Sequence, residues 1–184
     1  MFRHISERKL SSAKIKAYKL FYPGADAAAM LINLKKDLST LDIMPENIYL
    51  MTGTNNVDPI YYGKSSLKNA MRDIKELIDF VKHSYPKSIV HVINILPRDT
   101  LGRNEIVDEL NIMIEEYCLS SVKGVNFMNS QKLFKYHNGS RSNRYFMHPN
   151  QYYNDNCHLN REGVKRLGKY LKYWAHQHLE DENS

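Results

Sequence analysis

The stretch Ile89-Val90-His91-Val92-Ile93-Asn94-Ile95-Leu96 decides the fold class of this 184-residue chain. It is the most hydrophobic segment, and four of its first five residues are β-branched. A nearly continuous run of this kind is typical of a parallel strand that is covered on both faces. We therefore expect a strand over residues 88–96, inside a parallel sheet.

Strand and helix patterns alternate on both sides of this run. Alternating polar and apolar residues predict further strands, and apolar residues at helical spacing predict helices. The expected strands are 14–21, 47–51 and 124–127, and the expected helices are 3–11, 25–38, 67–83, 103–119 and 160–179. This order favours a single α/β domain over residues 1–184, built as a three-layer α/β/α sandwich around a parallel sheet.

Composition excludes several classes of protein. Lysine and arginine exceed aspartate and glutamate by 26 − 20 = 6, a modest basic excess. There is no apolar run near 18 residues, so no membrane partner is expected. Cys118 and Cys157 form no C-x-x-C pair, and the start of the chain does not read as a signal peptide, which together predict a cytoplasmic protein. The eight histidines show no H-E-x-x-H pattern, so we expect no metal and no cofactor.

The first candidate motif is Gly53-Thr54-Asn55-Asn56, at the end of the strand 47–51. Glycine permits a sharp turn there, and an asparagine side chain can donate to a developing oxyanion without itself titrating. The alternative is an ordinary strand-ending turn with asparagine in left-handed geometry. Parallel sheets carry their chemistry beyond the carboxyl ends of the strands, which also draws attention to the segment 96–98.

Two further motifs flank predicted helices. In Asp155-Asn156-Cys157-His158, the aspartate could orient the imidazole and the histidine could act as general base. The alternative is that Asp155 caps the helix and His158 packs, although Asn160 is itself a suitable cap. At the turn Tyr22-Pro23-Gly24-Ala25, Gly24 could offer its amide to an anionic centre.

In this order and spacing, the three motifs resemble the SGNH (GDSL-type) hydrolase superfamily, whose architecture is flavodoxin-like. The resemblance implies an acyl or acetyl ester hydrolase, with Gly24 and Asn55 as oxyanion donors and His158 and Asp155 as the base pair. It also implies that the rest of the third motif contacts the substrate, namely Gly53, Thr54 and Asn56. Asn56 stands where the family has an aspartate.

The family's Gly-Asp-Ser motif, which carries the nucleophile, does not occur in this sequence. Residues 2–8 resemble the helix that follows it, so we expect the family's first strand to be absent as well. Three explanations compete: an N-terminally truncated fragment, a shortened inactive member kept for binding, or a substitute nucleophile. Ser6, Ser11 and Ser12 are disfavoured as substitutes because they fall on or after a helix. Whether the chain is an enzyme stays open, and we expect it to be inactive as given.

The second functional class is a non-catalytic binding module. SGNH-like domains include the RNA-binding domain of the insect germ-plasm protein Oskar and esterase domains beside nucleic-acid-binding parts of retrotransposons. By this resemblance RNA is a possible partner. A basic stripe is expected on the last helix, at Arg161, Lys165, Lys169 and Lys172. The alternative is an ordinary solvated helix face.

Overall fold

A computed structural model describes residues 7–12, 15–120, 123–136, 140–146 and 157–181 of the chain. These fall into two compact units. The first, which we call the sheet unit, comprises residues 22–131, and the second, the terminal unit, comprises residues 1–21 together with 132–184. Each unit is described by itself.

The sheet unit is built around three parallel strands in the order β1-β2-β3. These are β1 (Asn47–Met51), β2 (Ile89–Ile93) and β3 (Val125–Met128). Leu50 is opposite Val92 across the first ladder, and Val90 is opposite Val125 across the second. All three strands lie where the sequence predicted them, with β2 shorter than the apolar run.

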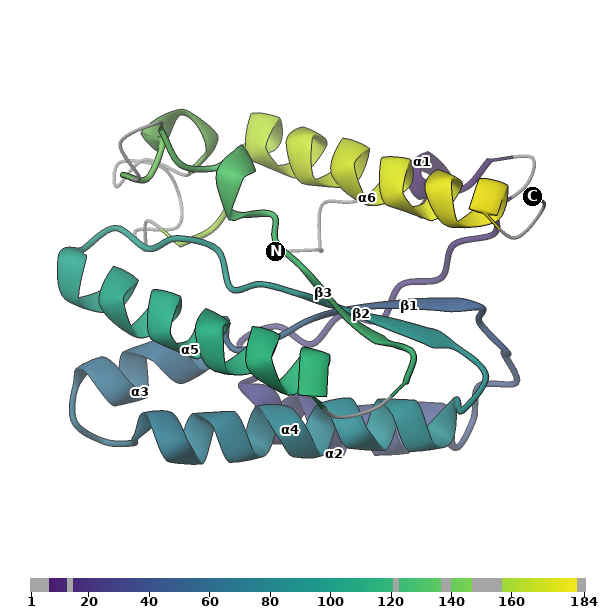
Figure 1. Ribbon diagram of the computed structural model, residues 1–184, viewed down its shortest axis with the longest axis horizontal. Helices are drawn as coiled ribbons and strands as arrows, with labels where there is room; N and C mark the ends of the chain where they lie inside the picture. The colour runs from purple at the N-terminus through teal and green to yellow at the C-terminus, as the bar shows by residue number, and fades with distance from the viewer. Residues whose placement is uncertain (1–6, 13–14, 121–122, 137–139, 147–156, 182–184) are drawn as a thin grey trace. The chain divides into compact units, whose positions relative to one another are not determined.

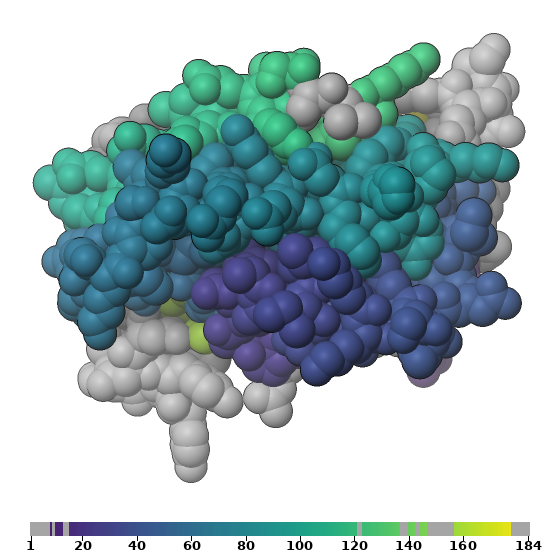
Figure 2. All heavy atoms as spheres, turned by 90° about the horizontal axis from the view of Figure 1, so that it is seen from below, coloured from purple at the N-terminus to yellow at the C-terminus, as the bar shows by residue number. Residues whose placement is uncertain are grey.

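Five helical segments of this unit precede, connect or follow the strands. They are α2 (Ala27–Leu38), η2 (Thr54–Asn56), α3 (Val57–Tyr61), α4 (Leu67–Ser84) and α5 (Leu101–Ser120). Figure 1 shows α2, α3, α4 and α5 on one side of the sheet, and Figure 2 shows α2 beside α4 on the face seen from below. This arrangement buries a core of aliphatic side chains, because one stripe of each helix is apolar.

The other face of the sheet carries polar and aromatic side chains. His91 is 1% exposed, its Nε2 lies 3.0 Å from Oδ1 of Asn47, and its ring stacks on Tyr49 at 4.8 Å. Burial raises the pKa of Tyr49 to about 12. Side chains of a strand alternate between faces, so the same five residues of β1 serve the apolar core and this polar face.

The predicted strand over residues 14–21 is wrong for its described part. Residues 15–21 carry no strand, and the sheet of described residues contains β1, β2 and β3 only. Alternation of polar and apolar residues shows which faces a strand would bury. It does not supply the neighbouring strand whose backbone groups would pair with it.

The terminal unit is organised around α6 (Arg161–Asp181), and α1 (Glu7–Leu10) packs against it. The short helices η3 (Gln131–Leu133) and η4 (Asn143–Tyr145) lie between β3 and α6 in the chain. Phe134 is fully buried and packs edge-on against Tyr145 and Phe146. No described helix of either unit is long and apolar enough to cross a bilayer.

Candidate active site

The loop that ends β1 begins at a glycine that the fold requires. Gly53 is buried and has φ of +93°, in the left-handed region that disfavours side chains. A Cβ atom added there would lie 2.6 Å from Cδ1 of Ile95 and 3.3 Å from Cδ1 of Ile74. The sharp turn predicted at this position is confirmed, and it brings the loop tight against the core.

The side chain of Asn56 is hydrogen-bonded to the amino terminus of α2. Its side chain is buried, and its Oδ1 accepts a hydrogen bond from the backbone N–H of Ala27 at 3.1 Å. Ala27 is the first residue of α2, where helix geometry leaves the N–H without an intrahelical partner. Asp26 caps the same helix by accepting from Ala29. Contact of Asn56 with a substrate stays a prediction.

Asn55 reaches the turn that contains Gly24. Its side chain is exposed, and Nδ2 donates to the backbone carbonyl of Ala25 at 2.9 Å. Gly24 is exposed with φ of +70°, and a Cβ atom there would meet nothing within 4 Å. The turn is anchored by Tyr22, whose hydroxyl donates to Asp37 at 2.7 Å. The structure thus brings together the two residues predicted as oxyanion donors, 31 positions apart in sequence.

Thr54 takes part through its backbone, and its partner is a buried arginine that sequence reasoning gave no role. Arg98 is 5% exposed, and its Nη1 donates to the carbonyl of Thr54 at 3.3 Å. Its Nη2 donates to both carboxylate oxygens of Asp58, at 3.0 and 3.2 Å. The only sequence signal was the position of Arg98 after the end of a buried strand.

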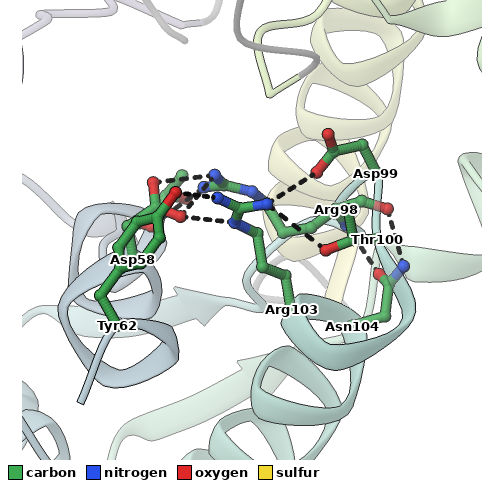
Figure 3. Close-up of polar contacts among 8 residues, drawn as sticks. Asp58, Tyr62, Arg98, Asp99, Thr100, Arg103 and Asn104 are labelled. Atoms are coloured by element: carbon green, nitrogen blue, oxygen red, sulfur yellow. Dashed lines mark hydrogen bonds and ion pairs between the residues drawn. The ribbon is translucent and has the colours of Figure 1, made fainter.

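Figure 3 shows Arg98 and Arg103 converging on Asp58. Nε of Arg103 donates to Asp58 at 2.7 Å, and its Nη2 donates to the hydroxyl of Tyr62 at 2.9 Å. Burial by itself would raise the pKa of Asp58. The hydrogen bonds and charges of Arg103 and Arg98 outweigh that effect and hold this pKa below its ordinary value. Asp58 is therefore ionised at neutral pH.

The segment after β2 is held by asparagine side chains of α5. Asn104 accepts from the N–H of Arg98 and donates to its carbonyl, both at 2.7 Å. Asn111 makes the same pair of bonds with the backbone of Ile95, at 2.8 and 2.9 Å. Side chains from two turns of α5 thus make the backbone hydrogen bonds that a neighbouring strand would otherwise make with this segment.

His158 belongs to the terminal unit. It is exposed and stands three residues before α6 begins at Arg161. Asn160 caps α6, as the sequence predicted, because its Oδ1 accepts from the N–H groups of Glu162 and Gly163, both at 3.0 Å. Asp155 lies outside the described residues, so the predicted contact between Asp155 and His158 stays a prediction.

The stripe predicted on α6 is largely exposed. Arg161, Lys165 and Lys169 are exposed, and Lys172 is half-buried. The same helix carries Arg166, which lies 4.9 Å from the ring of Tyr145. Within the part of the chain that the structure describes, no three histidine, cysteine, aspartate or glutamate side chains are grouped to hold a metal ion.

Comparison with known proteins gives a structural likeness. No family model matches the chain, and no curated protein matches it. A solved structure from Streptococcus pneumonia, described as a candidate platelet activating factor, superposes with a TM-score of 0.67 at 21% identity. The match covers 82% of this chain and 68% of that one.

A second solved structure is a carbohydrate esterase family 3 protein from Talaromyces cellulolyticus. It superposes with a TM-score of 0.55 at 14% identity, over 92% of this chain and 78% of that one. Likeness at such low identity shows the fold alone. The chain therefore has a three-layer α/β/α fold with a parallel sheet, as the sequence predicted.

Proposed function

We propose that residues 1–184 are a single SGNH-type ester hydrolase domain that holds the oxyanion-binding part of the site but contains no nucleophile of its own. The observation that carries this proposal is the meeting of Asn55 with the Gly24 turn, at the carboxyl end of β1. An esterase-like fold supports it.

The chemistry follows from what each group can donate or accept. Attack on an ester carbonyl turns its oxygen into an oxyanion, which neutral donors stabilise in a site fixed beforehand. The Asn55 amide has two N–H groups, and one of them is given to Ala25. The other, together with the Gly24 amide, could donate to that oxyanion. His158 would accept the proton of the attacking hydroxyl, and Asp155 would orient the imidazole.

Neither Ser11 nor Ser130 fits the role of nucleophile. Oγ of Ser11 accepts from the N–H of Ala17 at 3.1 Å, and Ser6 lies outside the described residues. Ser130 follows β3 but is fully buried and donates to Asn94 at 2.7 Å. A nucleophile must present its oxygen to the substrate at a strand-to-helix turn. We therefore expect the 184 residues by themselves to be inert.

A fluorophosphonate probe tests the proposal. We expect no labelling of the 184-residue chain, and labelling of a version that carries an upstream strand ending in Gly-Asp-Ser. In that version, which we call the restored chain, changing the added serine to alanine should abolish labelling. Asn55→Ala should lower kcat for acetyl ester hydrolysis by about 10²–10³-fold with the fold intact by circular dichroism. A folded restored chain without labelling or hydrolysis contradicts the proposal.

Substrate and location extend the same proposal. One structural neighbour is a carbohydrate esterase, which supports an acyl or acetyl ester as substrate. The two cysteines form no disulfide, which supports a reducing compartment such as the cytoplasm.

RNA binding is the second candidate, favoured by the exposure of Arg161, Lys165 and Lys169 on one face of α6. If single-stranded RNA binds there, the affinity should fall as salt rises, with a slope of about −0.7 for each phosphate contact. Changing the three residues to glutamine should flatten that slope. Lys64→Gln, at an exposed position of the sheet unit, serves as control. No binding at low salt contradicts this function.

A further inference from the structure

We propose that Arg98 is a positioning residue that fixes the loop carrying Asn55, through one hydrogen bond to the loop and two to α3. The proposal deepens the proposed ester hydrolase function and rests on it for its catalytic consequence. Its structural part concerns the sheet unit alone.

The guanidinium of Arg98 joins two successive elements of the chain. Nη1 contacts Thr54 in η2, one residue before Asn55, and Nη2 contacts Asp58 in α3. A guanidinium presents its donors in a rigid planar fork, so both contacts are fixed by one group. The backbone of Asn55 lies between the two anchored positions.

The backbone of Arg98, which carries this guanidinium, is itself held in place. Asn104 binds both the N–H and the carbonyl of Arg98, and the neighbouring Arg103 binds Asp58 from the same turn of α5. The long helix α5 therefore holds Arg98 on one side, and Arg98 holds the loop on the other. Arg103 is held in turn by Tyr61, whose ring lies 4.4 Å from its guanidinium carbon.

Stability alone does not account for this arrangement. Arg98 is buried together with its charge, and its Nε has no hydrogen-bond partner among the described residues. Burial of a charge with an unpaired donor is costly, and apolar side chains often stabilise such a position better. We therefore infer that the buried guanidinium serves to fix the geometry of the loop.

Substitution of Arg98 should weaken stabilisation of the transition state more than it weakens substrate binding. Without Arg98, the carbonyl of Thr54 loses its donor and the loop loses its tie to Asp58. The Asn55 amide would then sample positions away from the developing oxyanion. A displacement of about 1 Å in such a group can lower the rate by about 10²-fold.

Hydrogen exchange on the 184-residue chain tests the structural part. Two amides report on the loop: Asn56, which donates to Gly53 at 3.0 Å, and Ala27, which donates to Asn56. In Arg98→Met we expect both to exchange about 10-fold faster, while Val90 in β2 stays within about 2-fold of its original rate. Arg72→Met, which removes an exposed ion pair with Asp73, should change none of them.

Two results would overturn the structural part. The first is an equal acceleration at Val90, which would mean that Arg98 supports global stability only. The second is full protection of Asn56 and Ala27 in Arg98→Lys, which keeps the charge but lacks the fork.

Kinetics on the restored chain test the catalytic part. We expect Arg98→Met to lower kcat about 10- to 100-fold with KM within about 2-fold. A rise in KM at constant kcat overturns the positioning role. If the restored chain is inert before any substitution, the proposed function fails, and the exchange result still decides whether Arg98 fixes the loop.

Discussion

The loop of residues 53–58 and the segment of residues 157–160 lie in different units, and each carries residues of the proposed function. They are held in different ways. In the loop, Gly53 and Asn56 are buried, and Arg98, from the segment after β2, donates a hydrogen bond to the backbone. In the segment, Leu159 is buried and Asn160 caps α6, while His158 between its neighbours is exposed.

The proposed function gives this difference a chemical meaning. Oxyanion donors must be in place before charge develops, because reorganising them during the reaction would cost the energy they supply. The buried contacts of the loop satisfy that requirement. A general base has to exchange protons with substrate and solvent, and an exposed imidazole can do so. Four predictions test this contrast.

The largest effect is expected at Gly53. Gly53→Ala should lower the free energy of unfolding by about 2–4 kcal/mol, because it adds both left-handed strain and overlap with Ile95. Gly24→Ala shares the positive φ but meets open space, so we expect a loss of about 1 kcal/mol. Urea denaturation measures both. Equal losses of unfolding free energy would show that the close packing of Gly53 against Ile95 does not make its substitution more destabilising.

The two helix-capping asparagines give the next effect. Asn56→Ala should cost about 2 kcal/mol, because it leaves the buried N–H of Ala27 unpaired. Asn160→Ala should cost about 1 kcal/mol, because water can reach part of that cap. Thermal unfolding of the two variants compares them. A larger loss at Asn160 would mean that the segment before α6 is the more tightly held of the two.

Acid should remove the contribution of Asp58. Its pKa is lower in the folded chain than in the unfolded chain, so its ionised form stabilises the fold above about pH 4, and this stabilisation is lost as pH falls through the folded-state pKa. The Tm of the original chain should exceed that of Asp58→Asn at pH 7, and the difference should shrink as the pH falls below about 4. A constant difference between pH 7 and pH 3 would contradict the ion pair with Arg98 and Arg103.

The smallest effect concerns the two cysteines. Burial, with a further contribution from Glu115, raises the pKa of Cys118 to about 11, so little thiolate forms at pH 8. Cys157 is 8% exposed and adjoins the exposed His158. We expect iodoacetamide to modify Cys157 several-fold faster than Cys118 in the native chain, as followed by mass spectrometry. Faster modification of Cys118 would mean that the segment before α6 is better protected than α5.

Much of the fold could be predicted because its signals are local. The strand 47–51 was predicted to the residue, and the helices around 67–84 and 101–120 to within a few positions, because apolar periodicity shows which face is buried. The strand expected at 14–21 failed because pairing depends on a partner elsewhere in the chain.

The residues of the candidate site likewise fall into those that the sequence could predict and those that it could not. A glycine after a strand and an asparagine beyond it were visible in the sequence. The structure confirms the turn at Gly53 and places the Asn55 side chain on the carbonyl of Ala25, next to Gly24. Asn104, Asn111 and Asp58 were missed, since nothing in a helix pattern shows that a polar residue will bind the backbone of a distant loop.

The sequence by itself determined the order of strands and helices and the positions of the candidate motifs, because these depend on residues close together along the chain. Only the tertiary structure decided that Arg98 is buried against Asp58 and Thr54 and that Asn56 binds α2. Such contacts join residues about 30 to 45 positions apart, and the free energy that selects them comes from burial, which exists only once the chain has folded.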